Sequence, residues 1–358
     1  MTIDLNEEQR AAVITDSDKV LVASACGTGK TRTIMARIEF LLSQGIDSKN
    51  IFAITFTNAA AQEMRSRLPK EAEGVFIGTI HSLANYILLM NGVSTSAQLE
   101  NENFDWLFEQ VHNRDLYIPE VEHLLVDEFQ DICDNEYEFM IKDLKPKNFY
   151  FCGDSCQSIY SFKGSNYHHF MRLVRDPSVT VFNLTYNYRC GADIIDYADT
   201  ILASVTDIYK VPNVCMTARR GYVEVNQFEI HKILQELEMG EEYRSWFILC
   251  RTNKEVDDMI KVLEKNDIPC DTFKKADLDL SQLQERMKEN TVKVLTIHTS
   301  KGLENDNVMV IGAHRWNDEE KRISYVAATR ARNSLFWFIP KKAAAPRKKK
   351  ENLSYMEF

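Results

Sequence analysis

The sequence predicts an α/β protein with parallel sheets, divided into two domains. Short apolar runs typical of buried strands alternate with segments whose apolar residues recur at helical spacing, as in 254–266. Such alternation favours parallel sheets covered by helices on both faces. The strand candidates form two sets, 19–24, 51–56, 75–80, 123–128, 149–153 and 180–184, then 223–228, 245–251, 292–297, 307–312 and 334–340. We therefore expect domains over 1–183 and 184–340, and a basic, disordered tail over 341–358.

The composition is that of a globular protein in a reducing compartment. The 358 residues are 44% hydrophobic and 27% charged, and no apolar run approaches the length of a membrane span. The first residues, MTIDLNEEQR, lack the basic and apolar segments of a signal sequence. The eight cysteines show no paired C-x-x-C spacing. This argues against zinc and for a cytoplasmic location, with a nuclear or viral context left open.

The net charge of −10 does not by itself indicate a nucleic-acid binder, because it repels phosphate. A local basic or stacking groove can still bind a nucleic acid. The stretch KKAAAPRKKK carries six positive charges, and both a solubility role and a phosphate-binding or localisation role stay open for it. We expect a protein that is monomeric when isolated and does not bind membranes.

A glycine-rich turn joins the first strand candidate to a helical pattern. Gly27 and Gly29 let backbone N–H groups approach phosphate oxygens at a helix N-terminus. The lysine that follows, Lys30, would reach the β- and γ-phosphates, and the Thr31 hydroxyl would hold Mg²⁺. The strict pattern asks for glycine where this chain has Ser24, a small residue that causes modest strain. The loop residues expected at the nucleotide are Ser24, Ala25, Cys26, Gly27, Thr28, Gly29, Lys30, Thr31 and Arg32.

An acidic pair ends a later strand candidate, in the stretch HLLVDEFQD. The carboxyl end of a strand is where ligands bind in open α/β sheets. Asp127 is placed to share Mg²⁺ with Thr31, and Glu128 could position and deprotonate the attacking water. A solvated acidic turn is the alternative, which the upstream phosphate loop makes less favourable.

Nine motifs occur in a fixed order along the chain. They are LNEEQRAAV, ASACGTGKT, AITFTNAAAQEM, GTIHSLANYIL, LLVDEFQD, FCGDSCQSIYSFKG, LTYNYRC, VLTIHTSKGLE and ISYVAATRAR. Together they resemble the full motif series of superfamily 1 helicases of the UvrD, Rep and PcrA type, over residues 5 to about 339. The resemblance implies two RecA-like P-loop domains with ATP in the cleft between them. It also implies translocation along single-stranded DNA from 3′ to 5′, driven by closing and opening of that cleft.

The resemblance assigns catalytic roles on both sides of the cleft. Gln157 matches the γ-phosphate sensor, while Arg189 and Arg330 match two arginines that the second domain presents to the γ-phosphate. Arg332 is interpreted instead as a cation on the solvated face of the same helix as Arg330. The catalytic residues are thus expected to be Glu128, Lys30, Gln157, Arg189 and Arg330.

Three further residues resemble contacts to the nucleoside. Gln9 matches the glutamine that reads the adenine edge, since an amide can both donate and accept a hydrogen bond. Tyr188 matches the tyrosine that stacks on adenine, and Glu304 a glutamate near the nucleotide sugar.

Four segments resemble DNA-contact motifs. Base–aromatic stacking contributes about 1–3 kcal/mol per base and tolerates any sequence, so it can outweigh an unfavourable net charge. For Phe56 and Phe162 ordinary core packing is the alternative. The DNA-binding candidates are Phe56, Thr57, Asn58, Thr79, His81, Ser82, Tyr160, Phe162, His298, Thr299, Ser300 and Lys301.

The chain departs from the family most clearly in size. Relatives insert a sizeable accessory subdomain into each core domain, but only about forty residues separate TIHS from LLVDE, and roughly twenty separate IPCDTF from VKVLTIH. Smaller departures are Phe162 and Lys163, where relatives often have tryptophan and arginine. We therefore expect a motor core whose strand separation alone is weak.

The favoured function is an ATP-dependent single-stranded DNA translocase or helicase that uses ATP and Mg²⁺. One alternative is an ATP-gated switch or motor subunit that needs a partner protein such as a nuclease. The other is an RNA-directed helicase of the same superfamily, because recognition of the 2′-OH cannot be read from the sequence.

Overall fold

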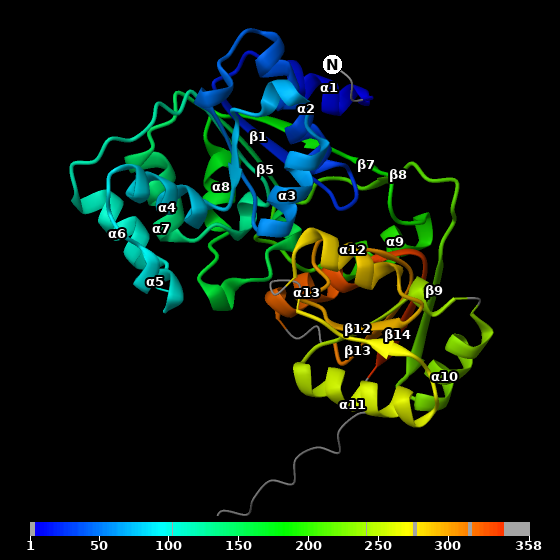
Figure 1. The fold of residues 1–358 in the computed structure, drawn as a ribbon. Coiled ribbons are helices and arrows are strands. Elements are labelled where there is room, and N and C mark those ends of the chain that lie inside the picture. The colour runs from blue at the N-terminus through cyan, green and yellow to red at the C-terminus, as the bar shows by residue number, and fades with distance from the viewer. Residues whose placement is uncertain (1–3, 102, 241, 275–277, 314–316, 340–358) are drawn as a thin grey trace, which may run out of the picture.

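The computed structural model describes residues 4–101, 103–240, 242–274, 278–313 and 317–339. Within them the chain forms two lobes, each built on a six-stranded, all-parallel sheet, which confirms the predicted fold class (Figure 1). The predicted tail over 341–358 lies outside the described residues. The last strand of the first sheet ends at Leu184, next to the proposed domain boundary.

The first sheet has the strand order β3-β2-β4-β5-β1-β6. Its strands are β1 Lys19–Ser24, β2 Ile51–Ile54, β3 Phe76–Gly78, β4 His123–Val126, β5 Asn148–Gly153 and β6 Thr180–Leu184. The helices of this lobe are α1 Glu7–Ile14, α2 Lys30–Ser43, α3 Asn58–Arg67, α4 Ile80–Met90, α5 Ser96–Glu100, α6 Asp105–Asn113, α7 Asp134–Glu138 and α8 His168–Arg175.

Helices cover both faces of this sheet, which is why its strands are apolar runs rather than alternating ones. Leu21 and Ala23 of β1 pack in one core with residues of α4, α6 and α8. Their neighbours Val20 and Val22 point the other way, into a core shared with α2 and α3. The period of two along the strand therefore decides which core each side chain enters.

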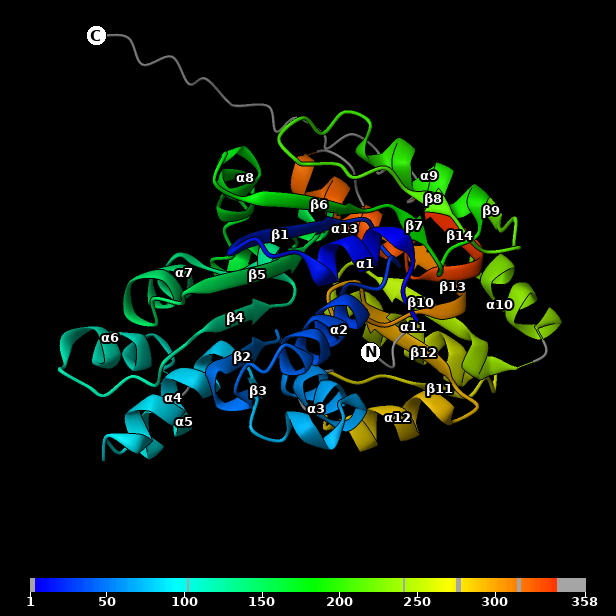
Figure 2. The ribbon, with the colours of Figure 1, turned by 90° about the horizontal axis from the view of Figure 1, so that it is seen from above.

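The second sheet has the strand order β11-β12-β10-β13-β14-β9. Its strands are β9 Tyr222–Gln227, β10 Trp246–Cys250, β11 Cys270–Asp271, β12 Val292–Thr296, β13 Asn305–Ile311 and β14 Ala331–Ile339. The helices are α9 Ala192–Leu202, α10 Ile230–Met239, α11 Asn253–Lys265, α12 Leu280–Lys288 and α13 Asp318–Ala328. Figure 1 shows α9 and α13 above this sheet and α11 below it, and Figure 2 shows the strands of the first sheet in the order given above.

The two lobes share part of one apolar core. Cys26, Cys156 and Ile159 of the first lobe pack in the same cluster as Phe247 and Val326 of the second. A two-stranded parallel ribbon of β7 Tyr186–Asn187 and β8 Val214–Cys215, which the sequence did not predict, lies between the sheets. The lobes are therefore joined by packing as well as by the chain.

The two connections where accessory inserts were expected to be missing are short. The helices α5 and α6 occupy the stretch between α4 and β4, and α12 occupies the stretch between β11 and β12. In the described part of the chain, no helix has both the length and the apolar character needed to cross a bilayer.

Candidate nucleotide site and aromatic surface

The glycine-rich turn has a left-handed backbone at two positions and packs closely against neighbouring side chains. Gly27 and Gly29 have φ of +67° and +83°, in the left-handed region that favours glycine. A Cβ on Gly27 would lie 2.7 Å from the Cβ of Arg189, and one on Gly29 would lie 2.9 Å from Nε2 of Gln9. Both glycines are thus required by conformation and by space, and the turn leads directly into α2 at Lys30.

Three side chains hold this turn. Thr28 Oγ1 donates to the carbonyl of Ala25 at 2.9 Å, and Gln9 Nε2 donates to the carbonyl of Thr28 at 2.9 Å. Ser24 Oγ donates to the carbonyl of Gly153 at 2.9 Å, so the departure from glycine adds a bond between β1 and β5. The turn is preorganised, as a phosphate-binding loop must be.

Gln9 and Tyr188, predicted at the adenine, lie beside this turn. Gln9 is buried, and its Oε1 accepts from the backbone N–H of Asn6 at 3.1 Å. The Asn6 amide also donates to Tyr188 Oη at 2.9 Å, and the Tyr188 N–H donates to the carbonyl of Gly27 at 3.0 Å. The Tyr188 ring is 47% exposed, which leaves it free to stack on a base, whereas Arg32 lies exposed on the first turn of α2.

The acidic pair lies at the carboxyl end of β4, where it meets α2. Thr31 Oγ1 donates to Asp127 Oδ2 at 2.7 Å. Burial raises the pKa of Asp127 to about 6, and the adjacent charge of Glu128 adds to the rise. Hydroxyl and carboxylate oxygens are the donors Mg²⁺ prefers, so this pair fits the cation. Among the described residues no group of three or more His, Cys, Asp or Glu could hold a metal, so phosphate and water would supply the remaining ligands.

Glu128 is kept ionised by the cations around it. Burial opposes ionisation, but the charges of Lys30 and Lys301 and a hydrogen bond from Gln130 lower its pKa to about 2. Its φ of +54° lies in the left-handed region, which is unusual for a residue other than glycine. Two adjacent carboxylates with separated pKa values suit a metal ligand and a general base.

Lys30 is ringed by negative charge. Burial works to lower its pKa, but the carboxylates of Glu128, Asp154 and Asp127 raise it above its ordinary value. The ammonium group is therefore charged, and a triphosphate at the turn would add further negative charge beside it.

A chain of hydrogen bonds runs from the first lobe to Arg330 of the second. Gln157 Nε2 donates to Asp154 Oδ2 at 2.7 Å, and its Oε1 accepts from Arg330 Nη2 at 3.2 Å. Arg330 is fully buried and also donates to the carbonyls of Val326 and Leu303. Burial lowers its pKa to about 10, which still leaves it charged at neutral pH.

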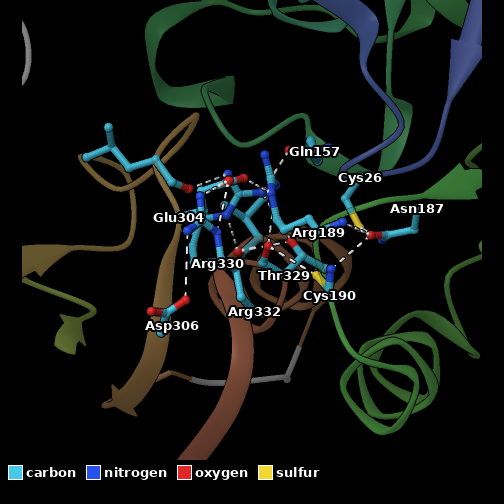
Figure 3. A network of polar contacts seen from close by, with 12 residues as sticks. Cys26, Gln157, Asn187, Arg189, Cys190, Glu304, Asp306, Thr329, Arg330 and Arg332 are labelled. Atoms are coloured by element: carbon cyan, nitrogen blue, oxygen red, sulfur yellow. Dashed lines mark hydrogen bonds and ion pairs between the residues drawn. The ribbon is translucent and has the colours of Figure 1, made fainter. Parts of the chain in front are cut away.

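A second arginine network surrounds Glu304 (Figure 3). The carboxylate pairs with Arg189 and with Arg332, which despite burial lower the pKa of Glu304 to about 2. The prediction for Arg332 was wrong. It lies near the start of strand β14 rather than on the helix of α13, and its guanidinium pairs with Glu304 and Asp306.

Cys26 of the phosphate loop contacts the segment that carries Arg189. Its Sγ accepts from the amides of Asn187 at 3.4 Å and Asn213 at 3.3 Å. A hydrogen bond from the Cys190 thiol lowers the pKa of Cys26 to about 6, against the effect of burial. Asn187 Oδ1 also accepts from the N–H groups of Arg189 and Cys190, at 2.8 and 2.9 Å.

Four predicted DNA residues form one aromatic surface made by both lobes. The rings of Phe56 and Tyr160 stack with centroids 5.1 Å apart, and Phe162 meets His298 edge-on at 5.3 Å. Tyr160 Oη donates to the carbonyl of His298 at 3.2 Å, which links the pairs across the lobes. The Phe56 and Phe162 side chains are 37% and 66% exposed, so neither is core packing.

The other DNA candidates are placed differently. Thr57 caps α3, where Asn58 is the first residue, and Thr79 and Ser82 cap α4. His81 lies in a separate group with the rings of Phe104 and Phe108. In the remaining motif the Thr299 and Thr296 hydroxyls lie 2.9 Å apart, and Ser300 and Lys301 are buried.

Gln130 is a site residue that the sequence reasoning missed. Its Oε1 accepts from the Asp154 N–H at 2.9 Å, and its Nε2 donates to Glu128 Oε2. The amide therefore links the acidic pair to the turn that carries Gln157. The available signal was its position in HLLVDEFQD, but a glutamine at that position is equally consistent with a surface residue.

These features define a P-loop nucleotide site between two parallel α/β lobes, with an aromatic surface across the same junction. Comparison with protein families agrees with this two-lobed P-loop architecture. The UvrD/REP helicase N-terminal domain matches residues 5–118 and 104–178, and the UvrD-like helicase C-terminal domain matches residues 272–342. The chain belongs to the UvrD/Rep helicase family.

Individual relatives cover the chain to different extents. A probable DNA helicase of Mycoplasma pneumoniae is 27% identical, over 93% of this chain and 82% of that protein. A putative ATP-dependent DNA helicase of Acanthamoeba polyphaga mimivirus is 27% identical over 92% of this chain, and the ATP-dependent DNA helicase PcrA of Staphylococcus aureus is 24% identical over 74%. The chain spans about half the length of the latter two, 52% and 50%.

Proposed function

We propose that this protein is an ATP-dependent motor that moves along single-stranded DNA. The observation that carries the proposal is that the nucleotide site and the aromatic surface are both assembled from the two lobes. Gln157 meets Arg330 across the junction at 3.2 Å, and Tyr160 meets His298 across it at 3.2 Å. A change in the spacing of the lobes would therefore alter both sites together.

Each group has a role in hydrolysis. ATP with Mg²⁺ would supply the phosphoanhydride bond and the cation that neutralises its charge. Thr31 and Asp127 would hold the cation, and Lys30 would bind the phosphates. Glu128 is ionised and can accept a proton from water. Arg189 and Arg330 bring positive charge from the second lobe, so the site is complete when the lobes are together.

The test is the ATPase rate with no nucleic acid, single-stranded DNA, single-stranded RNA and blunt duplex. Strong stimulation by single-stranded DNA, lost in Glu128→Gln, is expected. We expect Glu128→Gln to lower turnover by about 10²–10⁴ while leaving nucleotide binding intact, because the amide cannot accept the proton. Preferential stimulation by RNA would favour the RNA-directed alternative, and a flat low rate on every substrate would refute an autonomous motor.

We further propose movement from 3′ to 5′ with weak duplex unwinding. The short α4–β4 and β11–β12 connections support this, because little protein is there to grip a duplex. The alignment with the Mycoplasma relative spans 456 positions, more than the 358 residues of this chain, so that relative has internal segments this chain lacks. Release of a blocking protein from the 5′ but not the 3′ end of single-stranded DNA would show the direction. Processive unwinding by the isolated chain would contradict the second point.

A partner-dependent role is the second candidate. The same short connections favour it, since strand separation could then come from another protein, such as a nuclease. A rate that is low on DNA alone and rises on adding a partner would support it. We also propose a monomeric state, and a reducing, cytoplasmic location that the eight cysteines support, since none of them forms a disulfide.

A further inference from the structure

Lys301 reaches from the second lobe into the first. It follows β12 in the segment that was predicted to contact DNA, yet its side chain is only 6% exposed. The ammonium group pairs with the carboxylate of Asp131, which is buried, and donates to the carbonyl of Gln157 at 2.7 Å. It also lies 4.9 Å from the centre of the Tyr160 ring.

The geometry excludes a role for Lys301 in binding the DNA backbone. A phosphate contact needs a cation that reaches solvent, and this one is covered and paired. The partners named above are an acid, a carbonyl and a ring, and each of them belongs to the first lobe. A buried ion pair of this kind fixes one arrangement, because breaking it leaves a charge uncompensated.

The partners of Lys301 belong to both proposed sites, the nucleotide site and the aromatic surface. Asp131 ends the short turn Phe129–Asp131, which also carries Gln130, the residue bonded to Glu128. Gln157 is the residue that meets Arg330. Tyr160 belongs to the aromatic surface through its stack on Phe56. One ammonium group therefore contacts Asp131 of the segment with the acidic pair, the carbonyl of Gln157, and the Tyr160 ring of the aromatic surface.

We propose that Lys301 is a positioning residue that transmits DNA binding to the ATP site. Bases that stack on the aromatic surface would fix Tyr160, and Lys301, held between that ring and Asp131, would fix the Gln157 turn against Arg330. This rests on the proposed function, because it explains how DNA would stimulate hydrolysis.

The test is a double-mutant cycle in the full chain. Lys301→Met, Asp131→Asn and the double variant are compared with wild type by ATPase rate with and without oligo(dT). Lys293→Met is the matched control. Lys293 is also a buried lysine, on β12, but it donates to the carbonyls of Glu289 and Thr291 in its own lobe.

We expect Lys301→Met and Asp131→Asn each to lower the stimulation by oligo(dT) about 10-fold or more, and the double variant to be no worse than either. Lys293→Met should keep the wild-type stimulation. The salt dependence of oligo(dT) binding should be the same in wild type and Lys301→Met, since no phosphate contact is lost.

Other outcomes overturn the inference. If Lys301→Met is stimulated as strongly as wild type, or if the two effects multiply, there is no coupling through this pair. A salt slope lower by about one would make Lys301 a phosphate contact. If Lys301→Met does not fold, the stimulation of Asp131→Asn by oligo(dT) decides alone, because asparagine keeps the shape of aspartate. A wild type that DNA does not stimulate overturns the proposed function as well, whereas a stimulated wild type with equally stimulated variants overturns this inference only.

Discussion

The hydroxyl of Thr31 donates a 2.7 Å hydrogen bond to the carboxylate of Asp127, and so joins the start of α2 to the end of β4. We predict that this pair is the cation site. Thr31→Val should raise the Mg²⁺ concentration for half-maximal ATPase by about 10–100-fold, and Thr31→Ser should not, because it keeps the oxygen. Titration of the rate with Mg²⁺ at saturating ATP measures this. Equal requirements in the two variants would refute it.

The same site should respond to pH. In the metal-free protein the pKa of Asp127 is raised to about 6, so below that pH a proton competes with the cation. Glu128, with its pKa lowered to about 2, stays ionised throughout. We expect the apparent Mg²⁺ affinity to be constant above pH 7 and to fall by up to about tenfold per unit below pH 6. Calorimetric titration from pH 5 to 8 would show this, and an affinity that does not change over that range would contradict it.

The phosphate loop offers a test with a matched glycine. Gly27→Ala should reduce ATP binding by at least about tenfold, since its Cβ would overlap Arg189 Cβ at 2.7 Å and Asn187 Oδ1 at 2.8 Å. Gly45→Ala shares the positive φ, at +85°, but meets no atom within 4 Å. Gly45→Ala should lower the free energy of unfolding by about 1–2 kcal/mol and leave ATP binding unchanged. Nucleotide binding and thermal unfolding distinguish the two, and equal ATP affinity in both variants would refute the argument.

Cys26 should be the thiol that controls inactivation by alkylating agents. Its pKa is lowered to about 6, whereas burial raises the pKa of Cys156 and Cys250. Cys26 is fully buried between the lobes, so a reagent reaches it only when the lobes part, and its thiolate then reacts faster than a thiol. N-ethylmaleimide should inactivate wild type with a rate that levels off above pH 7, and ATP should protect, while Cys26→Ala should resist. Full inactivation of Cys26→Ala would place the sensitive thiol elsewhere.

The fold could be predicted because strands buried on both faces leave apolar runs in the sequence. The apolar run that begins at His123 correctly placed Asp127 and Glu128 at the carboxyl end of a strand, but the strand ends at Val126 and not at residue 128 as predicted. The very short strand β11, Cys270–Asp271, left no such signal. The motif order led to the proposed site residues, and the structure brings Lys30, Asp127 and Glu128 together.

What the sequence could not supply was the direction of individual side chains. Lys301 was placed with the DNA contacts because its motif neighbours point that way, but its ammonium group turns inward to Asp131. Arg332 was assigned to a helix that ends at Ala328. Gln130 owes its role to a partner, Asp154, that is distant in sequence. Each of these three cases concerns a contact between segments, which local pattern does not encode.

The apolar cluster that joins Cys26 and Ile159 to Phe247 and Val326 has a consequence for dissecting the protein. Cutting the chain near residue 184 would expose the apolar side chains that each half now covers on the other. Half-proteins expressed alone should aggregate, and they should become soluble when produced together, since reassociation buries that surface again. The same complementarity would make the pair usable as a split reporter whose reassembly restores the nucleotide site.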